Sequence, residues 1–131
     1  MDSDAPSPRT SLVPNRGPFA SEDEALREVV RRLADALDPA EIWLFGSRAT
    51  AEHSADSDFD LLVVTDDACG SDYDRAYAPL KGLGVGCDVI PVSASEFKSG
   101  RSEPTSLSHR VVNTGRRIYE REARRILSPA G

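Results

Sequence analysis

The stretch 42-IWLFGSRATAEHSADSDFDLLV-63 decides the fold, because it holds two apolar runs separated by a polar loop. The first run, Ile42 to Phe45, is short, continuous and ended by Gly46, which is typical of a strand covered on both faces. The second run, Phe59 to Thr65, is rich in β-branched residues and is followed by two turn-forming aspartates. We therefore predict two strands that flank a loop.

A helix is predicted before the first strand. Ser21 opens a capping box with Glu24, and the helix should stop before Pro39, because the residue that precedes a proline is disfavoured in helical conformation. Five apolar residues then recur at the spacing of one helix face: Leu26, Val29, Val30, Leu33 and Leu37.

The second half of the chain also alternates between predicted helices and predicted strands. A helical face is formed by Tyr73, Ala76, Tyr77, Leu80 and Leu83. Residues 87–92 (CDVIPV) predict a strand, which Pro91 marks as an edge strand or as locally irregular. Leu107, Val111 and Val112 indicate a short helix ended by Gly115, and the apolar pair Ile118 and Tyr119 follows. This order predicts an α/β or α+β domain, with a small mixed sheet of three to four strands and helices packed mainly on one face.

The length of 131 residues predicts one domain. Residues 1–20 contain four prolines and few apolar side chains, so we expect an unstructured arm there. The domain should then occupy residues 21–120, and residues 121–131 should form a basic tail, which is either a solvated surface or a patch that binds a partner.

The net charge is −6, from 16 lysines and arginines against 22 aspartates and glutamates, which argues against a protein that coats nucleic acid through its phosphates. Residues 49–74 contain no lysine or arginine, whereas arginine predominates from residue 101 onward. No apolar run approaches the roughly 20 residues that cross a bilayer. The first ten residues lack the features of a signal peptide, so we expect a cytoplasmic protein with no membrane partner.

Three features of the sequence call for a joint explanation: Gly46-Ser47 after the first strand, Asp58 and Asp60 at the start of the second, and Asp88 within the third. Side chains alternate along a strand, so Asp58 and Asp60 project from the same face. Like charges so close favour a neutralising cation, and several hard oxygens are the ligands that Mg²⁺ or Mn²⁺ prefers. Asp88 interrupts an apolar strand and needs a metal, an arginine partner or solvent. A metal explains all three features together.

Each feature alone also has an ordinary structural explanation. An aspartate pair spaced i, i+2 near a strand end is common in turns and caps, and Gly-Ser after a strand is most often a plain turn. The loop lacks the additional glycines and the lysine of a Walker motif. The glycine nevertheless allows close backbone approach, and Ser47 and Arg48 can donate to an anionic phosphate.

Five further residues are expected to have a structural role or no assigned role. Trp43 should pack in the core, and His53 should be a solvated loop residue. Cys69 and Cys87 are too few for a disulfide scaffold and lack the paired spacing of a zinc site. No role is assigned to His109.

The runs 46-GSRA-49 and 57-SDFDLLV-63, followed by Asp88 in a later strand, resemble the nucleotidyltransferase domain of the DNA polymerase beta superfamily. The pattern is most similar to that of the small stand-alone members called minimal nucleotidyltransferases (MNT), and it covers roughly residues 22–120. The resemblance places Gly46 and Ser47 on the triphosphate-binding pair, Asp58 and Asp60 on the metal-binding pair, and Asp88 on the third acidic residue. One departure is Ala51, where many relatives carry glycine.

The resemblance implies the nucleotidyltransferase fold and transfer of a nucleoside monophosphate, commonly AMP from ATP, to an acceptor hydroxyl. It implies two Mg²⁺ ions, with Mn²⁺ as a substitute: all three aspartates hold one ion, and Asp58 and Asp60 hold the other. Asp88 is implied as the group that accepts the proton.

Minimal members are often antitoxins of helical HEPN ribonuclease toxins, so the resemblance implies adenylylation of such a partner on a tyrosine. One alternative is a small-molecule nucleotidyltransferase, similar to those that modify aminoglycosides, whose acceptor pocket is made by a homodimer. Another is a non-catalytic module that neutralises a toxin by contact.

Overall fold

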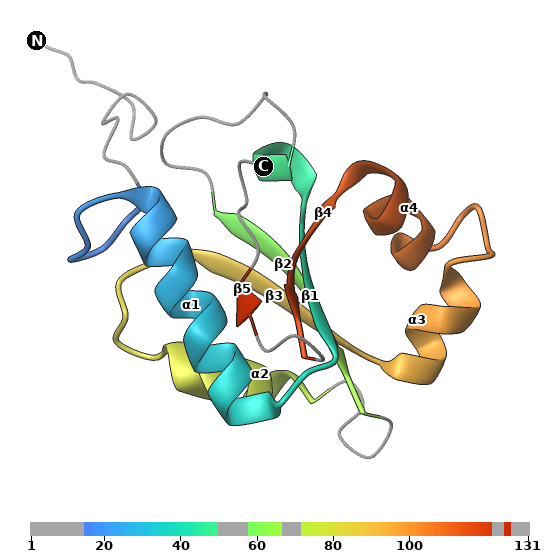
Figure 1. The fold of residues 1–131 in the computed structure, drawn as a ribbon, viewed down its shortest axis with the longest axis horizontal. Coiled ribbons are helices and arrows are strands. Elements are labelled where there is room, and N and C mark those ends of the chain that lie inside the picture. Colours follow the sequence, from blue (N-terminus) through green and yellow to red (C-terminus); the bar gives the residue numbers. More distant parts are fainter. Residues whose placement is uncertain (1–14, 50–57, 67–71, 122–124, 127–131) are drawn as a thin grey trace, which may run out of the picture.

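The computed structural model describes residues 15–49, 58–66, 72–121 and 125–126. Its strands are β1 (Glu41–Phe45), β2 (Phe59–Thr65), β3 (Cys87–Ser93), β4 (Arg116–Glu120) and β5 (Arg125–Ile126). They form one five-stranded sheet in the order β3-β2-β1-β4-β5 (Figure 1). Only the β2–β3 pair is parallel among these strands. The predicted α/β class with a mixed sheet is confirmed, and the two-residue β5 adds one strand to the expected number.

The first helix, α1 (Glu22–Leu37), has the bounds that its end signals predict. The Ser21 hydroxyl accepts a hydrogen bond from the Glu24 N–H, while the Glu24 carboxylate reaches back to the N–H of Ala20. At the other end Asp38 adopts the left-handed conformation, with φ of 46°, immediately before Pro39. Local chemistry therefore sets both ends of this helix.

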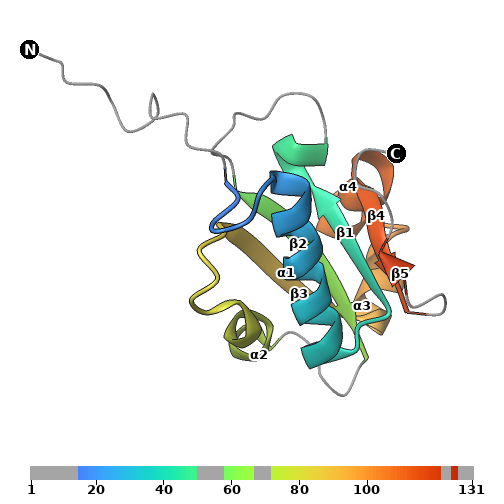
Figure 2. The same ribbon diagram turned by 60° about the vertical axis from the view of Figure 1, so that its left-hand side comes forward.

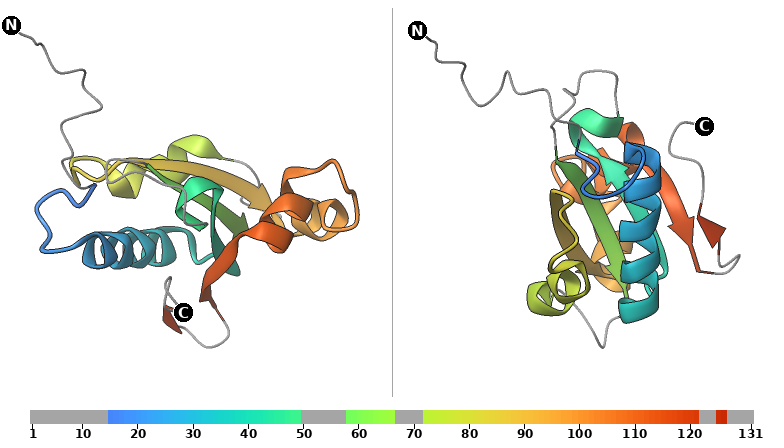
Figure 3. Two further views of the ribbon diagram at one scale, coloured as in Figure 1. Left: turned by 90° about the horizontal axis from the view of Figure 1, so that it is seen from above. Right: turned by 90° about the vertical axis from the view of Figure 1, so that its left-hand side faces the viewer.

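Two apolar layers cover the two faces of the sheet. On one face, α1 packs with α2 (Tyr73–Tyr77) and the 3₁₀ turn η3 (Ala78–Leu80) over the inward residues of β1 and β2, as Figure 2 shows for α1. On the other face, Phe97 of α3 (Ala94–Gly100) and Val111 of α4 (Leu107–Thr114) pack against Leu62 and Val64. The prediction that helices pack mainly on one face is therefore wrong: α1 and α2 lie on one side of the strands, but α3 and α4 lie on the opposite side (Figures 1 and 3).

The second layer also contains Trp43, which confirms its predicted packing role. Its ring lies 6.2 Å from that of Phe97, measured between centroids, and its Nε1 donates to the Glu41 carboxylate at 2.7 Å. The indole N–H thus has a partner while the ring remains half-buried.

The segment before α1 is ordered at residues 15–20, which fall inside the predicted arm; residues 1–14 lie outside the described part of the chain. Gly17 has φ of +51°, and a Cβ there would come within 2.9 Å of the Leu83 carbonyl oxygen. The chain before α1 therefore lies directly against the loop that leads into β3. At the other end of the chain, β5 falls inside the predicted basic tail.

None of the described helices combines the length and apolar character that a membrane crossing requires.

Candidate active site

The strand order brings the predicted motifs to one end of the sheet. β1 ends at Phe45 and continues into the 3₁₀ turn η2 (Gly46–Ala49). Because β1 and β2 are antiparallel, Phe45 is the register partner of Asp60. Because β2 and β3 are parallel, Asp60 is in turn the partner of Asp88. The Gly-Ser turn, the Asp-x-Asp motif and the third aspartate therefore meet.

The side chains of Asp60 and Asp88 project from the same face of the sheet, the face that carries α3 and α4, because Leu62 and Ile90 two residues later belong to that layer. Asp60 is half-buried and Asp88 is exposed. Burial raises the pKa of the Asp60 carboxyl, and the negative charges of Asp88 and then Asp58 raise it further. The carboxylates of Asp88 and Asp58 thus lie close enough to Asp60 to disfavour its ionised form.

Two glycines leave room for two of these carboxylates. Gly46 has φ of +74°, and a Cβ at this position would lie 2.2 Å from Oδ2 of Asp60. A Cβ on Gly86 would lie 2.3 Å from Oδ1 of Asp58. Any side chain at either glycine would have to displace a carboxylate, so both glycines are part of the site's geometry.

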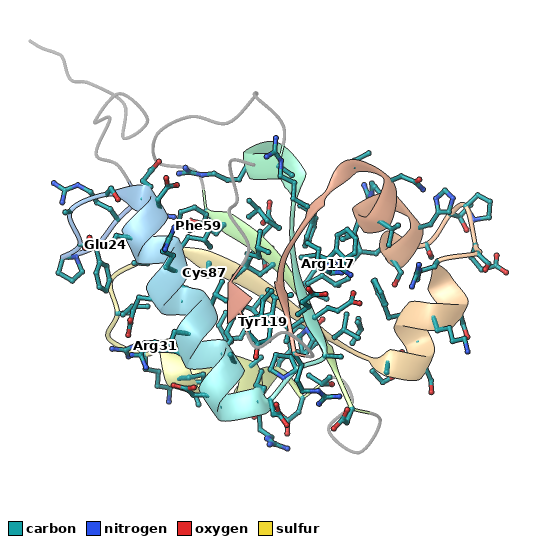
Figure 4. The ribbon with its side chains drawn as sticks, in the orientation of Figure 1. Glu24, Arg31, Phe59, Cys87, Arg117 and Tyr119 are labelled. Atoms are coloured by element: carbon teal, nitrogen blue, oxygen red, sulfur yellow. The ribbon has the colours of Figure 1, made fainter. Side chains whose placement is uncertain are left out.

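Asn15 fixes Gly86 from the other side. The Asn15 amide donates to the Gly86 carbonyl oxygen at 2.8 Å and accepts from the Gly86 N–H at 2.7 Å. The same Gly86 carbonyl accepts from the N–H of Phe59 at 3.0 Å, and Phe59 is the register partner of Cys87 (Figure 4). The segment before α1 is therefore connected to the start of β2, although Asn15 and Gly86 are 71 residues apart.

Arg48 contacts both α1 and β2. Its guanidinium forms two hydrogen bonds with Glu22, at 2.8 and 3.0 Å, and lies 4.6 Å from the centroid of the Phe59 ring. Only 4% of its side chain is exposed. In this arrangement Arg48 supports the turn η2 from inside the protein, and its contact with a triphosphate stays a prediction.

A tyrosine that sequence reasoning assigned only to a helix face contacts the third aspartate. The Tyr77 hydroxyl accepts from the Val89 N–H at 2.8 Å and donates to Oδ1 of Asp88 at 3.3 Å. Neither Tyr77 nor Asn15 has a local signal in the sequence that predicts these contacts, because each acts across the fold.

The donor chemistry of the site fits a divalent cation. Carboxylate oxygens are the ligands that Mg²⁺ and Mn²⁺ prefer, and the space beside Gly46 and Gly86 accommodates the oxygens of Asp60 and Asp58. Among the described residues, no three acidic, histidine or cysteine side chains already converge tightly enough to surround an ion. Asp58, Asp60 and Asp88 are the residues that would hold the ion.

Several predicted residues lie outside what the structure describes: the side chain of Ser47, and the whole of Ala51, His53 and Cys69. His109 is described on α4, where it neighbours the Asn113 amide, and it belongs to a different part of the fold from the three aspartates. Cys87 is a half-buried thiol, and burial raises its pKa to about 12. It is therefore protonated at neutral pH, as expected for an ordinary thiol.

Comparison with protein families gives a match to the family described as polymerase beta, nucleotidyltransferase, over residues 27–124. The chain belongs to this nucleotidyltransferase family. The match includes the Gly-Ser turn, the Asp-x-Asp motif and Asp88, and it extends through β4.

Two solved structures share the nucleotidyltransferase fold. One is a protein assigned to the nucleotidyltransferases, from Sulfolobus solfataricus, with 22% identity and a TM-score of 0.54 over 78% of this chain and 83% of the other. The second is a chain of a toxin–antitoxin complex determined with AMP-PNP, with 23% identity and a TM-score of 0.51 over 72% of each chain. A comparison with curated proteins found no match.

Proposed function

We propose that this nucleotidyltransferase-family domain transfers a nucleoside monophosphate, AMP from ATP, to a hydroxyl group of a partner protein. The observation that carries the proposal is the pairing of Asp60 and Asp88 across parallel strands, directly beside the turn at Gly46. This arrangement gives a carboxylate cluster next to a backbone segment that a triphosphate can approach closely.

Asp58, Asp60 and Asp88 would hold two Mg²⁺ ions, or Mn²⁺ in their place. Bound there, the ions neutralise the triphosphate and lower the pKa of the acceptor hydroxyl. The half-buried Asp60 fixes the centre of the cluster, and the exposed Asp88 is accessible to an incoming acceptor and accepts its proton. A bond forms between the α-phosphorus and the acceptor oxygen. The bond between the α-phosphorus and the oxygen that bridges it to the β-phosphate breaks, and pyrophosphate leaves.

The proposed partner is a helical HEPN-type toxin, which would make the chain the antitoxin of a toxin–antitoxin pair. Support comes from the likeness to a chain of a toxin–antitoxin complex, and the AMP-PNP in that complex supports ATP as the donor. The family resemblance further implies that the acceptor is a tyrosine of the toxin.

The test is transfer of label from α-labelled nucleoside triphosphates, in Mg²⁺, to a purified HEPN-type partner. Asp60→Asn and Asp88→Asn should abolish transfer without unfolding the protein. Asp35→Asn is the matched control, because Asp35 is an exposed aspartate on α1 that pairs with Arg31, and it should transfer at the wild-type rate.

Two outcomes would contradict the proposal. Labelling of small hydroxyl compounds but of no protein would make the chain a small-molecule nucleotidyltransferase. Full neutralisation of a toxin by Asp60→Asn, with no transfer by the wild type, would leave a module that acts by contact alone.

A further inference from the structure

β3 forms one edge of the sheet, so every second N–H of this strand faces away from β2. Val89 is one such position, because its N–H donates to the Tyr77 hydroxyl of α2 at 2.8 Å. Pro91 lies two residues further along and has no N–H to place at the same edge. This accounts for a proline within β3, as the sequence predicted for an edge strand.

Tyr77 spans the edge of the sheet. Its ring packs against the apolar layer beneath α1 and α2, which also contains Val89, while its hydroxyl reaches Asp88 on the opposite face. Since the hydroxyl accepts from the Val89 N–H, its own proton is directed to Oδ1 of Asp88. The Tyr77 hydroxyl therefore links the backbone N–H of Val89 to the carboxylate of the preceding residue, Asp88.

Asp88 is exposed, and a solvent-exposed aspartate samples several rotamers unless a partner selects one. We propose that Tyr77 is a positioning residue that holds the Asp88 carboxylate in the orientation needed to ligate a divalent cation together with Asp60. This inference rests on the proposed metal-dependent function of the same site. A tyrosine that donates to a metal-binding carboxylate fixes that ligand before the metal arrives, which lowers the ordering cost of binding.

A purely structural role would need only the bond from Val89, because that bond already satisfies the edge N–H. The bond to Asp88 distinguishes the two roles, since it has no function in pairing the strand. Substitution to phenylalanine removes the hydroxyl and keeps the ring in the apolar layer. Tyr73 supplies the matched control, because it lies on the same helix with 50% of its surface exposed.

The experiment measures binding of Mn²⁺ alone by electron paramagnetic resonance in wild type, Tyr77→Phe and Tyr73→Phe. The 3.3 Å bond to Asp88 is long for a hydroxyl donor. We therefore expect about a tenfold weaker Mn²⁺ affinity in Tyr77→Phe, the lower end of what the loss of such an outer partner produces. Tyr73→Phe should bind Mn²⁺ as the wild type does.

A double substitution separates positioning from general loosening of the edge. In an Asp88→Asn background, Tyr77→Phe should have no further effect on Mn²⁺ affinity, because the ligand that it orients is already lost. An equal loss in both backgrounds, or wild-type Mn²⁺ affinity in Tyr77→Phe, would overturn the inference. So would nucleotide labelling of Tyr77 itself, which would make it an acceptor.

The Mn²⁺ measurement also separates this inference from the proposed function. If the wild type binds Mn²⁺ in a Tyr77-dependent manner but labels no acceptor, the proposed transfer fails and the positioning role stands. If the wild type binds no Mn²⁺, the positioning role fails as well.

Discussion

Replacing Gly46 with alanine tests the geometry of the site, because this position combines two constraints. Its φ of +74° is unfavourable for any residue with a Cβ, by about 1–2 kcal/mol. The added Cβ would also lie 2.2 Å from Oδ2 of Asp60, so the carboxylate must rotate away. The first constraint acts on stability and the second acts on the site.

Gly82 separates these two effects. It has nearly the same backbone conformation, with φ of +75°, but a Cβ there would meet nothing within 4 Å. Gly82→Ala should therefore lower stability by the same 1–2 kcal/mol, which is about 4–8 °C in Tm for a chain of this length. Gly46→Ala should lose a similar amount, since the short Asp60 side chain can yield by rotating.

The two variants should differ sharply in activity. Displacing a carboxylate by about 1 Å misplaces the reacting groups, so Gly46→Ala should lose about 100-fold in transfer rate, while Gly82→Ala retains the wild-type rate. Thermal unfolding and transfer of label from α-labelled ATP measure the two quantities on the same samples. If Gly46→Ala transfers label within twofold of Gly82→Ala, the contact between Gly46 and Asp60 does not constrain the site and the reasoning is refuted.

Three further predictions follow from contacts around the site and on α1. Glu22→Gln removes the charge that pairs with the buried Arg48 guanidinium and should destabilise the protein by about 2 kcal/mol in urea unfolding; an unchanged midpoint would contradict a structural role for this pair. Asn15→Ala removes both hydrogen bonds to Gly86 and should lower stability by about 1–2 kcal/mol and weaken Mn²⁺ binding, whereas a stability loss alone would show that Asp58 does not depend on this contact. Arg31 and Arg32 lower the pKa of Glu28 from 4.5 to about 2, so the ion pairs contribute stability above pH 4.5 that is lost as the pH falls through 2. Glu28→Gln should therefore be less stable than wild type by up to about 1 kcal/mol at pH 7 and equal to it near pH 2, and a gap that persists at pH 2 would exclude this origin.

The parts of the fold that the sequence predicted are those that depend on local pattern. α1 has a capping residue, a periodic apolar face and a following proline, and all three signals agree. β1 and β2 are apolar runs bounded by turn residues, so their existence and approximate bounds follow from composition. Alternation along β2 then suffices to place Asp60 opposite the buried Phe59 and Leu61.

The parts that the sequence did not predict depend on short elements or on distant contacts. α3 has seven residues and only one buried apolar side chain, Phe97, so it has no periodic face. Its one signal is the capping box of Ser93 and Glu96, which lies at the end of β3. Tyr73 shares a helical face with Ala76 by spacing, yet it is exposed because α2 has only five residues.

Burial of Arg48 is a further feature that the sequence did not predict. Its ion pair with Glu22 spans 26 residues and joins α1 to the turn after β1. No local pattern carries that information. A charged residue next to a binding motif is therefore weak evidence for binding until its partners in the fold are known.

The three aspartates are held by three different parts of the chain. The turn after β1 leaves space for Asp60, and the loop before β3, which Asn15 holds by hydrogen bonds, leaves space for Asp58. Asp88 is linked to α2 by its hydrogen bond with Tyr77. These supports share no residue, but the carboxylates that they hold lie close enough to interact, so changes in two of the supports should not be additive. The motif in the sequence identifies the carboxylates, but the supports that make them a site are distributed over 71 residues between Asn15 and Gly86.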